Sequence, residues 1–327
     1  MSKAATSASD LPGRLAGAAC DQDETVLSVL EGQTSLTPEQ VHQVRVAVKR
    51  LRAIWRVMAG VVDKKTARRQ DKALRMAARA LAGARDTQVM GETLESLRKG
   101  ARDYESEAID AVRAQALAAE QELASPAMPE GLEGVFRADL YLWRNLNIEA
   151  DNAELIKKGF GRLYAEGRQQ GLEAVVENQP ELWHRFRKRV KYQLYQLEPL
   201  ESSLDDSALS LKEFRKLGKL LGELHDLHVL DEHLRKRKKD SEDKEPFVIV
   251  RQLIARLEAD RVAECRKRTR RCYSLKPKAF RKALAGAGFS PALRRRPRLL
   301  RVPGWARRPV SHPAGRRCRP PRCPGVR

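Results

Sequence analysis

Apolar residues recur at every third or fourth position along most of the chain, which is the repeat of an α-helix with one buried face. One regular series keeps a 3-4-3-4-3 spacing and consists of Val41, Val44, Val48, Leu51, Trp55 and Met58. No stretch alternates with the period of two that is typical of a half-exposed strand. Good helix formers such as Ala, Leu, Arg and Glu are abundant. The pattern therefore predicts an all-α protein.

Capping residues and breaks divide this pattern into separate helices. Thr37 is expected to cap a helix that begins with proline, with Gln40 in the capping-box position. The segment Asn178-Gln179-Pro180-Glu181 predicts a similar start, and Ser207 and Ser210 are candidate caps for a later helix. The predicted helices cover residues 14–32, 38–59, 65–82, 86–98, 102–124, 135–149, 153–177, 180–201, 208–222, 226–239 and 246–273.

A basic series follows the first apolar series one residue later along the chain. It consists of His42, Arg45, Lys49, Arg52 and Arg56. One residue corresponds to about 100° around a helix, so this basic stripe borders the packed face and runs for roughly 21 Å. Residues 41–58 contain five Arg or Lys and no acidic residue. A solvated helix face usually mixes charges, because like charges one turn apart repel each other.

The same arrangement returns 142 residues later. The second basic stripe contains His184, Arg187 and Lys191, with Lys188 beside them, and its core series contains Trp183, Phe186, Val190 and Leu197. Residues 182–197 again hold five Arg or Lys and no acidic residue. Repulsion between like charges therefore occurs twice, at equivalent places in the chain. This favours a site for an anion, which would relieve the repulsion, over an ordinary solvated face.

A second match, at a spacing of 140 residues, extends the repeat. It aligns Lys72, Arg75 and Arg79 with Lys212, Arg215 and Lys219. It also aligns Asp86 with Asp226, each in a segment that we predict to be a turn; we expect these carboxylates to cap a helix or to orient a basic side chain. Three basic pairs kept in register indicate a tandem duplication.

Basic side chains on four helices suit a long, repetitive polyanion better than a small ligand. Arg offers a planar pair of donors for phosphate, and Lys a mobile positive charge. The chain contains neither GxxxxGK[ST] nor a GxGxxG that follows a strand, so nucleotide hydrolysis is not expected. Aromatic residues near the stripes are sparse, which disfavours base-specific recognition of nucleic acid.

The net charge of +21 describes only one end of the chain. Residues 265–327 contain 21 of the 64 Lys and Arg, while residues 1–264 hold the other 43 together with all 43 acidic residues. The body is thus neutral, and its basic stripes are local segregations of charge. No apolar run is long enough to cross a membrane, and no secretory signal opens the sequence. Five cysteines without a CxxC motif indicate a reduced, cytoplasmic protein.

The last segment differs in composition from the rest. Residues 290–327 contain 12 Arg and 8 Pro among 38 residues and no acidic residue. Such a segment cannot bury enough apolar surface to fold. One interpretation is a disordered arm that seeks polyanions. The other, which we favour, is translation in a shifted reading frame of a GC-rich gene, and no functional residue is predicted there.

The two stripes and the Leu-Gly-x-x-His/Arg-Asp segments, recurring in tandem, resemble the CHAD family, the conserved-histidine α-helical domain. The resemblance covers about residues 10–285. It implies two four-helix bundles that are related by pseudo-two-fold symmetry and enclose a basic cavity for inorganic polyphosphate, and members associate with polyphosphate granules. Some members carry a preceding triphosphate-tunnel domain with an ExExK motif, which this sequence lacks. The resemblance therefore implies a non-catalytic binder without a cofactor.

The resemblance also divides the chain and assigns its site. We expect a flexible N-terminus over residues 1–9, repeat one over about 10–125, a connection over 126–150 and repeat two over 151–275, with a tail over 286–327. The implied polyphosphate-binding residues are His42, Arg45, Lys49, Arg52, Lys72, Arg75, Arg79, His184, Arg187, Lys188, Lys191, Lys212, Arg215 and Lys219. The second stripe departs from the first at Leu194 and Tyr195, where the first continues with Arg52.

Other functions stay open at this stage. The basic stripes and the tail also fit a nucleic-acid binder. A third hypothesis is an enzyme that acts on phosphoanhydrides, through phosphohistidine at His42 or His184 or through a metal. The candidate metal ligands are His225, Asp226, His228, Asp231 and His233. The equivalents of the first three in repeat one are Arg85, Asp86 and Gln88, which cannot hold a metal together. We therefore predict no metal.

Overall fold

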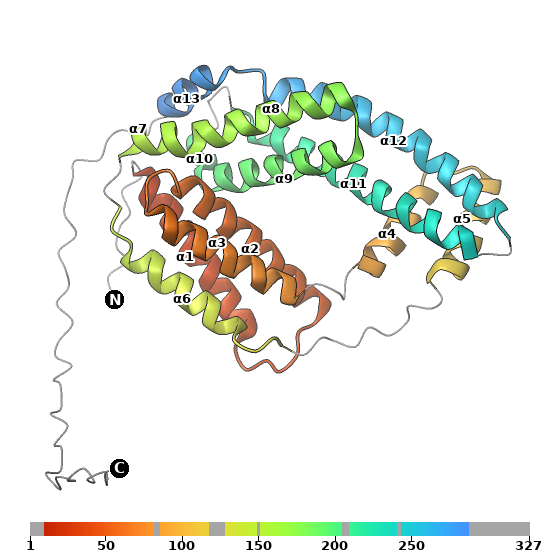
Figure 1. Cartoon of the computed structure of the whole chain (residues 1–327), viewed down its shortest axis with the longest axis horizontal. Coiled ribbons are helices and arrows are strands. Elements are labelled where there is room, and N and C mark those ends of the chain that lie inside the picture. Colours follow the sequence, from red (N-terminus) through yellow and green to blue (C-terminus); the bar gives the residue numbers. More distant parts are fainter. Residues whose placement is uncertain are drawn as a thin grey trace, which may run out of the picture. The chain divides into compact units, whose positions relative to one another are not determined.

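A computed structural model of the chain describes residues 10–81, 86–117, 128–148, 151–204, 209–240 and 243–287. These residues form helices joined by short connections, with no strand among them (Figure 1). The all-α prediction is confirmed. None of the helices in this described part is both long and apolar enough to cross a membrane.

The helices fall into two groups of four, a hairpin and several short elements. The first group is α1 (Leu11–Leu30), α2 (Pro38–Met58), α3 (Lys64–Ala80) and α6 (Leu132–Asn145). The second group is α8 (Gly161–Glu177), α9 (Pro180–Leu197), α11 (Leu211–Asp240) and α12 (Glu245–Cys272). The hairpin is α4 (Asp86–Arg98) and α5 (Asp103–Leu117). The short elements are α7 (Asn152–Leu155), the π-helix η2 (Ile156–Phe160), the 3₁₀-helix η3 (Glu198–Leu200), α10 (Glu201–Leu204) and α13 (Pro277–Gly286).

The first group is built around the apolar series of α2. Helix α2 packs against α1 and α3, and α6 packs against both of these (Figure 1). Every member of the series, from Val41 to Met58, is at most 2% exposed. Trp55 also donates an indole N–H to Asp139 of α6, with 2.9 Å between Trp55 Nε1 and Asp139 Oδ1. Burial of this face fixes the rotation of α2 and thereby the direction of its basic stripe.

In the second group, α9 packs between α8 and α11, with Trp183, Phe186 and Val190 buried beneath it. The approach of α8 to α9 depends on Gly171, where an added Cβ would lie 2.7 Å from the Phe186 ring. The predicted core spacing of both stripe helices is therefore confirmed.

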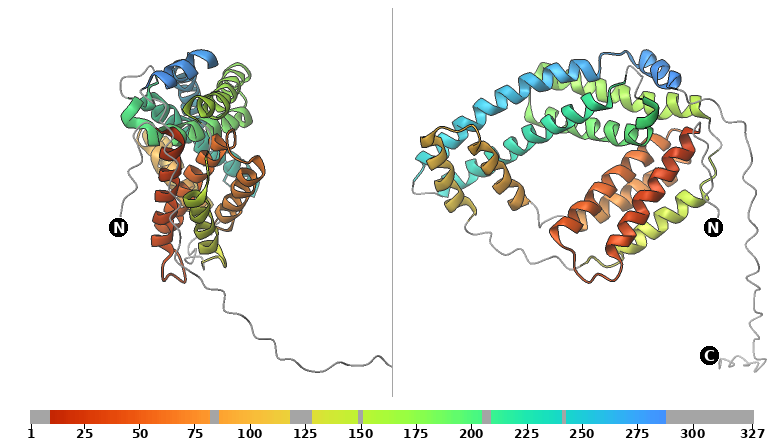
Figure 2. Two further views of the ribbon diagram at one scale, coloured as in Figure 1. Left: turned by 90° about the vertical axis from the view of Figure 1, so that its left-hand side faces the viewer. Right: turned by 180° about the vertical axis from the view of Figure 1, so that it is seen from behind.

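The hairpin of α4 and α5 has a core of its own. Its apolar residues pack against α11 and α12, along the ends of those helices that lie far from α13 (Figure 2). Helix α11 takes part in both cores, because Leu224 belongs to the main core and Leu227 to that of the hairpin. The hairpin, which follows α3 in sequence, is thus attached to the second group.

One predicted helix break is wrong, and one helix was not predicted. The sequence predicts a break between residues 222 and 226, but α11 runs through it, and Asp226 lies inside a helix. Burial of Leu221, Leu224 and Leu227 keeps the helical spacing across Gly222. Helix α13 was not predicted; it is held by packing on α8, where the Phe280 ring stacks on Tyr164 with centroids 3.9 Å apart.

The predicted caps have mixed outcomes. Thr37 and Gln40 form the complete capping box at the start of α2, and Ser210 Oγ accepts from the Glu213 N–H at the start of α11. At the start of α9 only the proline has its predicted role, because Gln179 makes no side-chain cap. Ser207 and the tail after residue 287 lie outside the described residues.

Candidate functional site

The two basic stripes meet because α2 and α9 pack against each other. A buried hydrogen bond from Gln196 Nε2 to the Ala53 carbonyl oxygen, 3.1 Å long, joins the two helices. The apolar series of both helices face the core, so the basic series lie on the adjoining faces. Four cations gather there, two from each helix. We call Arg45, Lys49, Arg187 and Lys191 the basic cluster.

The members of the basic cluster perturb one another. The Lys49 side chain is exposed to solvent, yet the surrounding protein removes enough water to lower its pKa to about 8. Loss of solvation is the largest cause, followed by repulsion from Arg45, Arg187 and Lys191. Desolvation and the Arg187 charge also lower the pKa of Lys191. The four charges are thus held together in partly desolvated surroundings.

Among the residues that the structure describes, no carboxylate lies at ion-pair distance from the basic cluster. Within the described part of the chain, Lys49, Arg187 and Lys191 make no ion pair shorter than 4 Å, and Arg45 donates only to the Leu81 carbonyl oxygen, at 3.1 Å. The buried Nε of Arg187 has no hydrogen-bond acceptor among these residues. Buried N–H groups almost always have a partner, so an unpartnered guanidinium N–H between other cations is the arrangement expected of an anion site.

A pair of histidines borders the basic cluster. His184 Nδ1 of α9 lies 3.1 Å from His225 Nδ1 of α11, and their ring centroids are 4.4 Å apart. Such a contact needs one donor and one acceptor nitrogen, so at least one ring is neutral. Burial, first, and then the charge of Arg187 lower the pKa of His225 to about 4. Burial and the charges of Lys188 and Arg187 also lower the pKa of His184.

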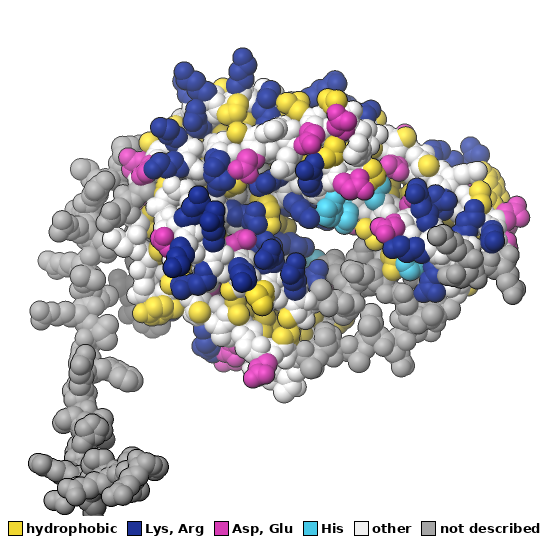
Figure 3. Space-filling model, viewed as in Figure 1, with side chains coloured by type: hydrophobic (Ala, Val, Ile, Leu, Met, Phe, Trp, Pro, Cys, Tyr) yellow, Lys and Arg dark blue, Asp and Glu magenta, His cyan; other side chains and the backbone are white. Residues whose placement is uncertain are grey.

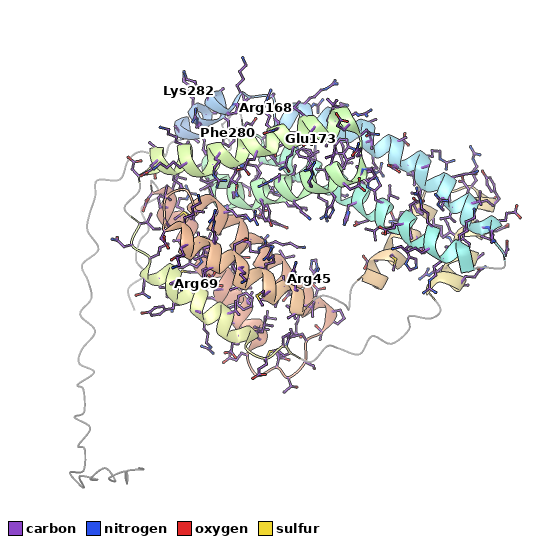
Figure 4. All side chains as sticks on the ribbon, viewed as in Figure 1. Arg45, Arg69, Arg168, Glu173, Phe280 and Lys282 are labelled. Carbon is purple, nitrogen blue, oxygen red and sulfur yellow. The ribbon has the colours of Figure 1, made fainter. Side chains whose placement is uncertain are left out.

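The surface around the basic cluster is visible in Figures 3 and 4. Lys and Arg side chains gather over α2 and α3, and histidines lie across a hollow, on the side of α9 and α11 (Figure 3). Arg45 lies at the edge of α2 that faces this hollow (Figure 4). The hollow is thus bordered by groups that donate hydrogen bonds to anions.

The CHAD domain model matches residues 24–235 of the chain. The chain belongs to the CHAD domain family. The match includes both stripe helices and the first 25 residues of α11. Among solved structures, the chain is similar to PptA from Streptomyces chartreusis, with 14% sequence identity and a TM-score of 0.48; the alignment covers 85% of this chain and 97% of that one. No curated protein matches the sequence.

The C-terminal half of the first stripe is neutralised inside this CHAD domain. Arg52 Nε lies 2.9 Å from Asp71 Oδ1 of α3, and Arg56 contacts both oxygens of the same carboxylate at 3.2 Å. The Arg56 guanidinium also lies over the Tyr192 ring, 4.5 Å from its centroid. Arg52 is therefore a member of an ion-paired group, apart from the basic cluster.

The basic residues of α3 and α11 lie on exposed faces. Arg215 pairs with both oxygens of Glu201, and Lys219 Nζ lies 3.9 Å from Glu223 Oε1. The others make no ion pair within the described residues; they are Lys72, Arg75, Arg79 and Lys212. None of these residues is among the causes of the lowered pKa of Lys49 or of Lys191, in contrast to Arg45 of α2 and Arg187 of α9.

The remaining predicted residues are placed as follows. His42 is half-buried at the start of the α2 stripe, and Lys188 is exposed on α9. Asp86 begins α4, as a capping or turn residue does, but its side chain lies outside the described residues. Asp226 lies on α11, one residue after His225, and its charge raises the pKa of Lys191 against the larger effects of burial and Arg187.

The candidate metal ligands of α11 are engaged elsewhere. His228 Nε2 lies 2.9 Å from Glu258 Oε1, and Asp231 binds Arg251 and Arg235 at 2.7 Å each. No group of three or more His, Cys, Asp or Glu among the described residues could hold a metal ion.

Two features of the site were not predicted from the sequence. Asp71 lies one helical turn before Arg75 on α3, and nothing in the spacing of α2 or α3 marks it as a partner of the first stripe. The contact of His225 with His184 joins residues that lie 41 positions apart in the sequence. The only sequence feature that pointed to the segment around His225 was the second match of the repeat.

A groove away from the basic cluster lies between α3 and α6. Its volume is about 610 Å³, and Arg69 is its single charged residue. Most of the other lining residues are small or apolar, and Gln70 and Tyr141 add uncharged polar groups. The groove therefore lacks the charge to hold a polyanion.

Proposed function

We propose that this CHAD domain binds inorganic polyphosphate without hydrolysing it, and that the basic cluster is the centre of the binding site. The observation that carries the proposal is the meeting of two cations from α2 with two from α9, with no carboxylate at ion-pair distance among the described residues. Phosphate oxygens would supply the missing negative charge and accept from the buried Arg187 Nε–H.

The proposal includes a pseudo-two-fold pair of bundles around a basic cavity. Helices that the repeat aligns touch one another, α2 with α9 and α4 with the C-terminal part of α11. Contact between equivalent elements is expected near a two-fold axis. An axis between α2 and α9 would direct both stripes into one space, and the exposed cations Lys72, Arg75, Arg79 and Lys212 would extend it along a chain of phosphates.

We favour binding over catalysis because the identified groups of the site are cations and neutral imidazoles. These groups pair with phosphate oxygens but do not by themselves position a water molecule for attack. On this proposal the protein acts in the cytoplasm and associates with polyphosphate granules where they form. The match to the CHAD domain supports polyphosphate binding in general terms.

The test compares two variants of equal charge. In the first, the four members of the basic cluster become Gln. In the second, four exposed arginines with their own carboxylate partners become Gln; they are Arg98, Arg113, Arg137 and Arg185. We expect the first variant to lose at least about 100-fold in affinity for long-chain polyphosphate and the second to lose less than about fivefold.

Circular dichroism and thermal unfolding would establish that both variants are folded, and both would be measured with and without residues 288–327. Equal losses in the two variants would contradict a defined site. Displacement of polyphosphate by RNA at equal phosphate concentration would favour the nucleic-acid hypothesis instead. Release of phosphate from polyphosphate in the presence of divalent ions would favour an enzyme.

A further inference from the structure

Lys49 has an uncommon combination of properties among the lysines of the chain. The residue is exposed, and its amine makes no ion pair within the described residues. Arg45, Arg187 and Lys191 lie close enough to repel its charge. It is thus an accessible amine beside groups that can hold a phosphate.

These surroundings also favour the neutral, nucleophilic form of the amine. With a pKa of about 8, roughly a tenth of Lys49 amines are neutral at pH 7, against fewer than about one in a thousand for a lysine of ordinary pKa. Only the neutral amine has a free electron pair for attack on a carbonyl carbon. The same neighbours that lower the pKa would attract an anionic reagent.

We propose that Lys49 is an acylation site for small acyl phosphates, whose phosphate group binds beside Arg187 and Lys191 while the acyl group is transferred to Lys49 Nζ. The inference rests on the proposed anion site, but it names a different ligand class and a covalent product. Nothing in it requires the site to accept a polymer.

The reaction is a simple acyl transfer. The neutral Lys49 amine attacks the carbonyl carbon of the acyl phosphate, and a C–N bond forms. The bond between that carbon and the phosphate oxygen breaks, and inorganic phosphate leaves with the electron pair. The amine loses one proton to the phosphate or to water. The cations beside Lys49 favour this step because they stabilise the leaving phosphate.

Acylation would change the site that carries it. An acylated lysine has no positive charge, so the basic cluster would keep three cations instead of four. Bound polyphosphate would in turn occupy the Arg187 side of the site and raise the pKa of Lys49, which would protect the amine. Acyl phosphates and polyphosphate should therefore compete.

The experiment treats the full chain with acetyl phosphate near neutral pH and follows each lysine by peptide mass spectrometry. Lys282, exposed on α13, serves as the internal reference (Figure 4). We expect Lys49 to be acetylated at least about tenfold faster than Lys282. Arg187→Gln should reduce this preference at least about fivefold. The matched control is Arg185→Gln on the same helix, where Arg185 pairs with Glu173 of α8, and it should leave the preference unchanged.

A second reagent separates phosphate recognition from general reactivity. Neutral acetic anhydride should show a smaller preference for Lys49, because only the lowered pKa favours this amine. Arg187→Gln should reduce the preference less with the anhydride than with acetyl phosphate, since with the anhydride it only raises the pKa of Lys49 and removes no phosphate contact. Equal acetylation of Lys49 and Lys282 by acetyl phosphate would overturn the proposal, and so would an equal preference with both reagents.

Polyphosphate binding is measured separately on untreated protein, so the two proposals can fail independently. If polyphosphate binds but Lys49 is not preferred, only the acylation site is wrong. If Lys49 is acetylated preferentially but polyphosphate does not bind, only the proposal that polyphosphate is the ligand is wrong. Treatment with acetyl phosphate should lower the affinity of the unsubstituted protein for polyphosphate. The same treatment should leave the affinity of the Lys49→Arg variant unchanged.

Discussion

The two halves of the basic stripe on α2 have the same sequence spacing but different surroundings. In the N-terminal half, Arg45 and Lys49 face Arg187 and Lys191 of α9 and have no carboxylate partner among the described residues. In the C-terminal half, Arg52 and Arg56 share the Asp71 carboxylate.

A basic stripe therefore identifies a helix face but not a binding site. Cations that are paired within the protein must exchange that carboxylate for a ligand, which reduces the net gain from binding. Cations that repel one another gain more when an anion arrives, because the repulsion is relieved. The second copy shows a related contrast between two helices: Arg187 of α9 makes no ion pair within the described residues, whereas Arg215 of α11 is paired with Glu201.

The largest expected effect compares the two halves directly. Replacing Arg45 and Lys49 by Gln should lower the affinity for polyphosphate about 100-fold, at about 1.5 kcal/mol for each charged contact. Replacing Arg52 and Arg56 by Gln should lower it less than about tenfold, while lowering the free energy of unfolding because Asp71 loses both partners. Isothermal titration calorimetry and urea unfolding measure the two quantities. Equal losses of affinity would mean that the whole stripe binds the ligand.

The next effect is a dependence on pH. The free protein releases the Lys49 proton above a pKa of about 8, and phosphate prefers the charged amine, so affinity should fall about tenfold between pH 7 and pH 9. Lys49→Arg keeps its charge throughout this range and should lack most of the decrease. Titrations of both proteins at several pH values check this. An identical decrease in both would assign it to another group.

Much of this fold could be predicted from the sequence because the signals are local and repeated. The apolar spacing places Val48 and Trp55 in the core, and the capping box places the start of α2, since each depends on residues within a few turns. The error at residues 222–226 has the opposite origin. Gly222 and the alignment with repeat one favour a break, but packing of α11 on α12 and α4 keeps the helix continuous.

The candidate site could be predicted only in part for a related reason. The spacing brings Arg45 and Lys49 to one face, and the duplication supplies Arg187 and Lys191, but only the packing of α2 on α9 brings the four together. The pairing of Asp71 with Arg52 and Arg56 depends on how α3 is rotated about its axis. The spacing of residues in α2 gives no information about that rotation.

A smaller effect should follow from releasing the paired half. Asp71→Asn removes the charge that Arg52 and Arg56 share while keeping a side chain of similar size. Both arginines would then be available to phosphate, and affinity should rise about threefold, because the two residues border the site but lie apart from its centre. Competition binding against labelled polyphosphate measures the change. Glu173→Gln on α8, which releases only Arg185, is the matched control and should have no effect. A loss of affinity in Asp71→Asn would mean that the ion pairs orient the arginines for binding.

The smallest expected effect concerns the space next to Lys191. A Cβ added at Gly218 of α11 would lie 3.7 Å from Lys191 Cε and Nζ, which is ordinary van der Waals contact. Gly218 lies inside a helix, where alanine is favoured over glycine by about 0.5–1 kcal/mol, so Gly218→Ala should raise the free energy of unfolding by that amount. Affinity for polyphosphate should change less than about twofold, since the methyl group touches the Lys191 stem and leaves the faces of Arg45 and Lys49 open. Urea unfolding and calorimetric titration of the same preparation give both values. A loss of tenfold or more in a stabilised variant would show that phosphate enters between α9 and α11, and the centre of the site would then lie nearer to the His184–His225 pair than to α2.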